Sequence, residues 1–309
     1  MGKLGWTVAL LLAVLVGYIW YKPAFDPESL RGARVVVTGC SSGIGEQMAY
    51  HYARFGARVI ITARREGRLK KVVAKMKDLG AQEAIYVAGD MGKAEDCERT
   101  IQTAKEKFGG KLDYLVINHA SLSSIKKNGT ASLFWDGDMD VMHAEVTNNY
   151  YSYIRLASLA LPLLHKTNGS LVILGSMSGK IASVFSTFYA GTKFALDGFF
   201  SSLRQELAMQ DVNVSITYCV IGLVDTEIPD KFEKTFGFLM DLPRASPADC
   251  AMAIIRGGAA RQREVYYPWK EAWLATKLSS IFPQFFESLT MGIYPKIHEK
   301  SILFKENNN

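Results

Sequence analysis

Residues 34–45, RVVVTGCSSGIG, decide the fold of this chain. The β-branched run Arg34–Thr38 favours a buried strand, and three glycines follow it at Gly39, Gly43 and Gly45. A helical apolar pattern comes next. Glycines let the backbone approach a ligand closely, and the amides of a helix N-terminus bind phosphate. A purely structural turn is the alternative, but a glycine cluster between a first strand and a first helix predicts a dinucleotide-binding unit.

The end of the second expected strand selects the cofactor. The run Arg58–Thr62 is followed by Ala63, Arg64 and Arg65, and no carboxylate comes before Glu66. An acidic residue here would hold the ribose hydroxyls of NAD, whereas guanidinium groups bind a 2′-phosphate through paired hydrogen bonds. The sequence therefore predicts NADP(H), with a solvated basic helix start as the alternative. The groups expected to hold it are Gly39, Ser41, Ser42, Gly43, Ile44, Gly45, Arg64 and Arg65.

Strand-like and helix-like segments alternate along the rest of the chain. Continuous apolar strands between helices indicate a parallel sheet that is covered on both faces. We therefore expect a single α/β domain with a Rossmann-type doubly wound sheet, over residues 34–268. The expected strands are 34–38, 58–62, 84–88, 115–118, 170–174 and 214–220. The expected helices are 45–55, 66–79, 142–164 and 188–210.

A phenol and an ammonium group are expected on one face of a helix. Tyr189 and Lys193 share the segment 188–210 four residues apart, and Ser176 lies just past the fifth strand. A free phenol has a pKa of about 10, and a nearby ammonium group together with an oxidised nicotinamide lowers it. Tyr189 would then donate or accept a proton while Ser176 binds the substrate oxygen. Because such a pair is common by chance, its weight comes from agreement with the glycine-rich turn.

Together these motifs resemble the short-chain dehydrogenase/reductase family, from Arg34 to Tyr267. The residues that carry the likeness are TGCSSGIG at 38–45, Asn118-His119-Ala120, Ser176, and Tyr189 with Lys193. Within the family, the branch of 11-beta-hydroxysteroid dehydrogenase type 1 and its type 1-like relatives is similar in the stretches 194–204, 219–227 and 255–267. That branch often carries Ser-Lys where this chain has Ser41-Ser42, and Arg65 is expected to compensate for the missing charge.

The resemblance implies roles for further residues. It assigns substrate binding to Ser176 and Tyr189 and proton transfer to Tyr189. It also assigns cofactor contacts to Tyr189 and to Lys193, which would hold the nicotinamide ribose. Asn149, with Asn148 as the alternative, would support the lysine through water. The additional cofactor contacts that the resemblance implies are Asp90, Met91, Asn118, His119, Ala120, Ile221, Val224 and Thr226.

The N-terminus carries an uncharged apolar run, Leu4–Trp20. As a helix this run would span about 25 Å, near the lower limit for crossing a bilayer, and aromatic residues stand near both ends. A cleaved signal peptide is the alternative, but it would end in small residues, whereas this run ends in bulky aromatic ones. We therefore expect a single-pass membrane anchor over residues 1–22 and a linker over 23–33.

Three asparagines begin acceptor triplets for N-glycosylation: Asn128, Asn168 and Asn213. A single triplet often arises by chance. Three of them behind an apolar anchor favour a catalytic domain in the lumen of the endoplasmic reticulum. The alternative is that all three are unmodified turns.

The segment after Thr226, IPDKFEKTFGFLM, is apolar and aromatic. In this fold it would cap the substrate pocket, which predicts a hydrophobic alcohol or ketone such as a steroid. Ordinary lid packing explains its residues Phe236, Phe238 and Leu239 equally well. The tail 269–309 is rich in Trp, Phe and Leu, so we expect a segment at the membrane surface or a homodimer contact, with packing on its own domain as the alternative.

Composition argues against several other classes of protein. The net charge is +6 without a run of like charges, so we expect no nucleic-acid partner. Four cysteines without a CxxC pair indicate neither a disulfide framework nor a metal site. The leading hypothesis is a lumenal, membrane-anchored hydroxysteroid dehydrogenase. The alternatives are a reductase of retinoids, lipid aldehydes or xenobiotic carbonyls, and a membrane scaffold without turnover; the preferred direction of reaction is not encoded.

Overall fold

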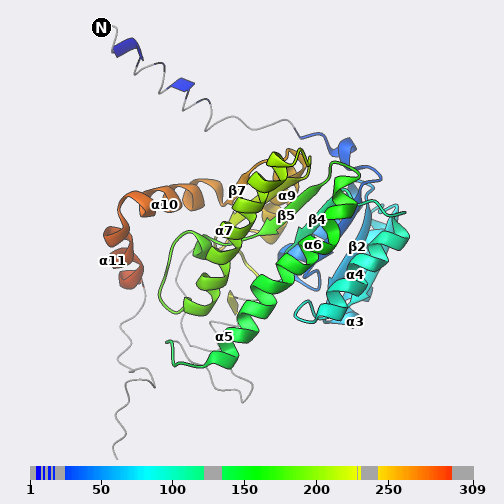
Figure 1. The fold of residues 1–309 in the computed structure, drawn as a ribbon, viewed down its shortest axis with the longest axis horizontal. Coiled ribbons are helices and arrows are strands. Elements are labelled where there is room, and N and C mark those ends of the chain that lie inside the picture. The colour runs from blue at the N-terminus through cyan, green and yellow to red at the C-terminus, as the bar shows by residue number, and fades with distance from the viewer. Residues whose placement is uncertain are drawn as a thin grey trace, which may run out of the picture.

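The computed structural model describes residues 5–7, 10, 13, 14, 17, 25–121, 134–227, 229, 230 and 243–293. Within this part of the chain, a seven-stranded sheet has the order β3-β2-β1-β4-β5-β6-β7, and each neighbouring pair of strands is parallel. Helices cover both faces of the sheet (Figure 1). The predicted Rossmann-type doubly wound sheet is therefore confirmed, with the strand order reversing between β1 and β4.

The elements follow the expected alternation, with additions. The strands are β1 (Arg34–Thr38), β2 (Arg58–Ala63), β3 (Glu83–Ala88), β4 (Tyr114–Ile117), β5 (Ser170–Leu174), β6 (Ser215–Ile221) and β7 (Glu264–Tyr267). The helices are α2 (Gly43–Arg54), α3 (Glu66–Asp78), α4 (Ala94–Lys107), α5 (Met139–Val146), α6 (Ser152–His165), α7 (Thr187–Met209), α9 (Pro247–Ala259), α10 (Trp269–Ile281) and α11 (Pro283–Ile293). Single turns are η1 (Pro27–Leu30), η2 (Thr147–Tyr151) and η3 (Met177–Gly179). The sequence analysis did not anticipate the helices α4 and α9 or the strand β7.

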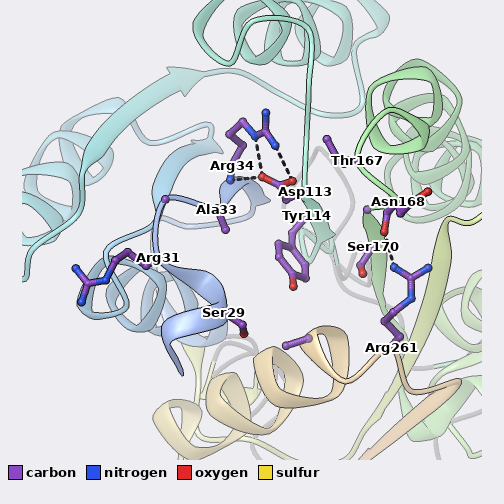
Figure 2. A pocket seen from close by; sticks show the side chains of 13 residues that line it. Ser29, Arg31, Ala33, Arg34, Asp113, Tyr114, Thr167, Asn168, Ser170 and Arg261 are labelled. Atoms are coloured by element: carbon purple, nitrogen blue, oxygen red, sulfur yellow. Dashed lines mark hydrogen bonds and ion pairs between the residues drawn. The ribbon is translucent and has the colours of Figure 1, made fainter. Parts of the chain in front are cut away.

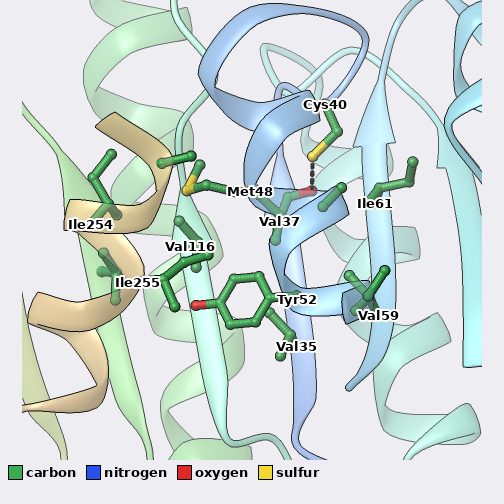
Figure 3. Close-up of a cluster of buried hydrophobic side chains, with 14 of the residues drawn as sticks. Val35, Val37, Cys40, Met48, Tyr52, Val59, Ile61, Val116, Ile254 and Ile255 are labelled. Carbon is green, nitrogen blue, oxygen red and sulfur yellow. Dashed lines mark hydrogen bonds between the residues drawn. The ribbon is translucent and has the colours of Figure 1, made fainter. Parts of the chain in front are cut away.

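The side chains of β1 alternate between two buried clusters, one on each face of the sheet. Val35 and Val37 pack with α2 and α9, and Figure 3 shows them around Tyr52 and Ile255. Val36 points to the opposite face, where α4, α6 and α7 supply the partners. All three valines are fully buried. This two-sided burial explains why the strand is a continuous β-branched run and not an alternating one.

The helix expected over 142–164 is present, and the backbone is helical without a gap from Met139 to His165. A π-helical turn, η2, joins α5 to α6 within it. The sequence did not predict this turn. The extra residue of this turn carries Asn149 into the interior, where its amide side chain bonds both backbone groups of Ser121. A local widening of this kind leaves little trace in a 3.6-residue apolar periodicity, so the sequence pattern runs through it.

The described residues near the two ends of the chain differ in how they pack on the domain. The expected membrane anchor, Leu4–Trp20, lies largely outside the described residues, and no helix among the described residues is long and apolar enough to span a bilayer. Phe25 packs onto the domain, and its ring centroid lies 5.6 Å from that of Phe55. Near the other end, Ala272 and Thr276 of α10 are buried, whereas α11 projects away from the sheet (Figure 1).

One close crossing joins β1, α2 and β4 at the carboxyl edge of the sheet. A Cβ atom added to Gly45 would lie 2.5 Å from Nδ2 of Asn118, and closer still to the carbonyl oxygen of Gly39. A Cβ atom on Gly39 would likewise lie 2.8 Å from the Asn118 amide. The start of α2 therefore touches the ends of two strands with no room for a side chain.

We expect Gly45→Ala to lower the melting temperature by more than about 5 °C, because its new methyl group meets backbone that cannot give way. The matched control is Gly67→Ala on α3, where an added Cβ meets nothing within 4 Å. That variant should melt about 1–3 °C higher, since alanine is the better helix former by about 1 kcal/mol. Thermal circular dichroism measures both melting temperatures. Equal shifts in the two variants would show that the close crossing can accommodate a side chain.

Candidate active site

The carboxyl ends of the strands bring the predicted site residues to one edge of the sheet. Gly39 directly follows β1, Asn118 follows β4, Ser176 follows β5, and Ile221 is the last residue of β6. Tyr189 lies in the first turn of α7, near enough to Ser176 for that hydroxyl group to act on the pKa of the phenol. Open α/β sheets bind ligands at this edge, outside the point where the strand order reverses. Residues distant in sequence thus meet where this class of fold places its chemistry.

Lys193 is an almost fully buried lysine, with 1% of its surface exposed. Its Nζ donates to the carbonyl oxygen of Leu174 at 2.9 Å and to the hydroxyl of Tyr153 at 3.4 Å. Burial lowers the pKa of Lys193 to about 7, and the negative charge of Glu145 only partly opposes this shift. The ammonium group is therefore held by two oxygen atoms at the floor of the site, and its charge is poised near neutral pH.

Tyr189 presents the face of its ring to this lysine. Lys193 Nζ lies 5.5 Å from the centroid of the Tyr189 ring. Burial raises the pKa of Tyr189 to about 12, although the hydrogen bond with Ser176 acts in the opposite direction. The chain alone therefore does not lower the pKa of Tyr189 as the sequence predicts. The ammonium group of Lys193 is itself partly neutralised, and it is bonded to the carbonyl oxygen of Leu174. The positive charge of an oxidised nicotinamide has to supply the remaining lowering of the Tyr189 pKa.

Contacts with α7 and β7 fix the loop that carries Ser176. Ser176 caps η3 by accepting a hydrogen bond from the amide of Ser178 at 3.1 Å. Lys180 ties the same loop to α7 and β7 by ion pairs with Asp197 at 2.9 Å and Glu264 at 3.0 Å. The sequence reasoning missed Lys180, because nothing in its local pattern shows that two carboxylates from distant elements converge on it.

Asn149 and Asn148 are distinguished by the π-helical turn. Asn149 is fully buried, accepts from the Ser121 amide at 2.8 Å, donates to the Ser121 carbonyl at 2.9 Å, and also donates to the buried carboxylate of Glu145. Asn148 is only half-buried and donates to the carbonyl of Ala144 at 2.9 Å. The structure thus brings Asn149 to the site and leaves Asn148 beside it. Sequence reasoning missed Glu145, although its spacing of four from Asn149 is a usable signal.

His119 connects β4, β1 and α6. Its Nδ1 lies 2.8 Å from the Thr38 hydroxyl, its Nε2 lies 2.8 Å from the Ser152 hydroxyl, and its carbonyl accepts from Tyr153 at 2.6 Å. Burial, and next the charge of Lys193, lower the pKa of His119 to about 3. This imidazole is therefore neutral at physiological pH and positions its neighbours. The sequence pointed to Thr38 only as the first residue of the glycine-rich motif, and it did not point to Ser152 or Tyr153.

The glycine-rich turn has the shape that a dinucleotide phosphate needs. Gly39 and Gly43 have positive φ angles of 73° and 60°, and α2 begins at Gly43 with its first amides directed at the turn. The hydroxyl groups of Ser41 and Ser42 accept from Arg65 Nη2 at 2.8 and 2.7 Å. The turn therefore combines amide donors, hydroxyl groups and a guanidinium group, which fits a cofactor with an additional phosphate.

The remaining residues expected to contact the cofactor line the same edge. A Cβ atom on Gly43 would lie 3.0 Å from the methyl group of Thr226, so the segment after β6 covers the turn. Met91 and Val224 are buried, and the backbone amide of Asp90 donates to Asp96 at 2.7 Å. Ala120 follows His119, and Arg64 is exposed but near enough for its charge to help lower the pKa of His119.

A polar pocket lies at the opposite edge of the sheet (Figure 2). It has a volume of about 350 Å³ and lies at the amino ends of β1, β4 and β5. Arg34 on its wall is neutralised by Asp113, with N–O distances of 2.7 and 2.8 Å, and Arg261 donates to the carbonyl oxygen atoms of Asn168 and Asn213. Since the predicted site residues lie at the carboxyl edge, this pocket is not the candidate active site.

Among the described residues, no group of three histidine, cysteine or acidic side chains is placed to hold a metal ion. All four cysteines are buried free thiols. Burial raises the pKa of each of them, so none is a ready thiolate.

Comparisons with known sequences agree with this geometry. The model of the short chain dehydrogenase family matches residues 33–236. The hydroxysteroid 11-beta-dehydrogenase 1-like protein of Gallus gallus is 49% identical over 263 residues, which are 85% of this chain and 86% of that protein. Its namesake in Danio rerio is 44% identical over 288 residues, 92% of this chain and 96% of that protein.

Solved structures show the same fold. A short chain dehydrogenase from Burkholderia cenocepacia in complex with NADP has a TM-score of 0.63 at 24% identity, covering 76% of this chain and 95% of that one. An alcohol dehydrogenase from Thermococcus sibiricus complexed with 5-hydroxy-NADP has a TM-score of 0.62 at 25% identity, covering 75% and 94%. This chain belongs to the short-chain dehydrogenase family. Within it, the hydroxysteroid 11-beta-dehydrogenase 1-like proteins are similar to this chain over most of its length.

The burial of Lys193 predicts how the stability of the protein depends on pH. Its pKa falls from 10.5 when exposed to about 7 in the folded protein, so below pH 7 folding carries the cost of a buried charge. Between pH 7 and 10.5 the folded state has already lost this proton while the unfolded state still binds it, so this cost fades. Removing the amine with Lys193→Met therefore stabilises the protein most at low pH.

We expect the melting temperature of Lys193→Met, relative to the unaltered protein, to be higher at pH 6 than at pH 10 by at least about 3 °C. The two hydrogen bonds lost with the amine add a shift that does not depend on pH. Differential scanning fluorimetry of both proteins without added cofactor measures the difference. A melting difference that stays constant across this range would contradict the buried, depressed pKa.

Proposed function

We propose that this chain is an NADP(H)-dependent oxidoreductase that interconverts a hydroxyl group and a ketone on a hydrophobic substrate, and that the substrate is an 11-beta-hydroxysteroid or its 11-oxosteroid partner. The observation that carries the proposal is the meeting of Ser176, Tyr189 and Lys193 beside the glycine-rich turn. The names of the relatives and the NADP bound in similar structures support the steroid and the cofactor.

The chain's own groups divide the work on the carbonyl group. Bound NADPH supplies the hydride. The Ser176 hydroxyl orients the substrate oxygen, and the Tyr189 hydroxyl delivers the proton to it. Lys193 holds the nicotinamide ribose and stabilises the phenolate that remains on Tyr189. Asn149 positions the backbone of Ser121 at the mouth of the site.

Aromatic side chains beside the catalytic tyrosine support an apolar substrate. The rings of Trp135 and Phe188 lie 5.0 Å apart between centroids, and Phe188 directly precedes Tyr189. The rings of Phe134 and Phe185 form a second pair at 5.4 Å. Such half-buried ring faces suit a flat hydrophobic skeleton better than a sugar or a charged acid. The expected cap with Phe236, Phe238 and Leu239 lies outside the described residues.

The steroid assignment is tested by a panel of three carbonyl substrates: cortisone, all-trans-retinal and a small aromatic ketone. We expect the detergent-solubilised protein to oxidise NADPH with cortisone, and Tyr189→Phe to reduce kcat by about 100- to 10,000-fold because only the proton donor is lost. Binding of NADPH to the variant, measured by fluorescence, should be unchanged.

Each other outcome has a definite reading. Turnover of retinal or the aromatic ketone alone would keep the family and the mechanism but reject the steroid substrate. Full activity in Tyr189→Phe would reject the proton donor. Absence of turnover with cofactor still bound would favour the non-catalytic membrane scaffold.

We also propose a single-pass anchor in the endoplasmic reticulum membrane, with the catalytic domain in the lumen. The run Leu4–Trp20 supports an anchor, and Asn168 and Asn213 are exposed, as acceptors of glycans must be. The face of α10 and α11 supports a lipid contact or a homodimer contact, because Ile281 and Phe285 are 65% and 64% exposed.

The location is tested in microsomes from cells that express the full chain. We expect the protein to resist alkaline carbonate extraction, and endoglycosidase H to increase its mobility. The matched control replaces Asn128, Asn168 and Asn213 by Gln, which should abolish the mobility change. Extraction by carbonate would contradict the anchor, and an unglycosylated protein would contradict the lumenal orientation.

A further inference from the structure

The carboxylate of Glu227 occupies the basic end of the candidate cofactor site. Its Oε2 accepts from Arg65 at 2.7 Å and from the Ser42 hydroxyl at 3.1 Å, and its Oε1 accepts from Arg68 at 2.7 Å. These three donors come from the glycine-rich turn and from the start of α3, whereas Glu227 follows β6. A distant segment of the chain thus supplies an anion to this cluster of donors.

The cluster is built for an anion. Arg65 also donates to Ser41 at 2.8 Å, so its guanidinium group lies between two hydroxyl groups and the carboxylate. The helices α2 and α3 both begin here, at Gly43 and Glu66, and their N-terminal dipoles favour negative charge. Although partial burial raises the pKa of Glu227, hydrogen bonds and charge from Arg65 leave it below its ordinary value.

Arg65 is one of the two residues, with Arg64, whose guanidinium groups the sequence assigns to the 2′-phosphate of NADP(H). Ser41 and Ser42 are among the residues expected to hold the same cofactor. A carboxylate and a phosphate monoester need the same donors, so both cannot occupy this cluster at once. We propose that Glu227 is an internal competitor for the 2′-phosphate, which must leave Arg65, Arg68 and Ser42 before NADP(H) binds fully. This inference rests on the proposed use of NADP(H).

The competition weakens NADP(H) selectively. NAD(H) carries no 2′-phosphate, so it binds with Glu227 still in place. Both Arg65 and Glu227 are nearly half exposed, at 43% and 47% of their side chains, so water screens their attraction and the competition is modest. Glu227 directly follows Thr226, whose methyl group packs over Gly43. Glu227 is therefore a specificity-determining residue for the cofactor and not a catalytic one.

The test measures binding of the cofactor and not turnover. Glu227→Gln keeps the size of the side chain and removes its charge. We expect this variant to bind 2′,5′-ADP and NADPH about three- to tenfold more tightly than the unaltered protein, with NADH affinity unchanged. Isothermal titration calorimetry with the purified full chain gives all three constants without any substrate.

Glu66→Gln is the matched control. It removes the same charge one residue from Arg65, but Glu66 is bonded to Lys70 at 3.0 Å and to Tyr86 at 3.1 Å instead of the cluster. We expect Glu66→Gln to leave the three constants unchanged. Equal tightening by both variants would mean a general charge effect and overturn the proposal.

Two further outcomes separate the inference from the proposed function. If Glu227→Gln binds NADPH and 2′,5′-ADP no more tightly than the unaltered protein, the competition is rejected while the use of NADP(H) stands. If NADH binds but neither NADPH nor 2′,5′-ADP binds to any of the three proteins, the proposed cofactor is wrong and the inference fails with it. Thermal melting confirms that each variant is folded.

Discussion

The close crossing of β1, α2 and β4 is the constraint on which the rest of the structure depends. Gly45 touches the carbonyl of Gly39 and the amide of Asn118 with no space for a Cβ atom. This contact aims the N-terminus of α2 at the carboxyl edge and fixes the end of β4 beside it. The phosphate-binding turn and the residues after β4 therefore have their positions because two strands and a helix approach more closely than side chains allow.

The catalytic edge is a polar layer inside an apolar domain. Lys193 is buried at the cost of part of its charge, and the carbonyl oxygen of Leu174 and the hydroxyl group of Tyr153 hold it. His119 is neutral and joins Thr38 to Ser152. Such a layer is stable only when its buried donors and acceptors are paired. The same pairing holds the ammonium group beside Tyr189, so structural satisfaction and catalytic geometry come from one set of bonds.

The basic end of the candidate cofactor site is built differently. Its charges are exposed, their bonds are screened, and one carboxylate from the segment after β6 takes the place that a phosphate would need. Exposed ion pairs rearrange at little cost, whereas the buried layer around Lys193 does not. The chain thus combines a rigid centre for proton transfer with an adjustable end for choosing between cofactors.

The sequence alone determined the Rossmann-type sheet, the glycine-rich turn and the set Ser176, Tyr189 and Lys193, because strand burial, glycine spacing and helical periodicity are local patterns. It missed the role of Lys180, because that depends on which distant groups meet. It also missed the π-helical turn η2 and the role of Glu145, although the spacing of four between Glu145 and Asn149 is a local signal. It also placed Arg65 at a phosphate without showing that Glu227 reaches it from 162 positions away. Only the tertiary structure decides such contacts, since the pKa of Lys193 and the partners of Arg65 arise from groups that folding brings together.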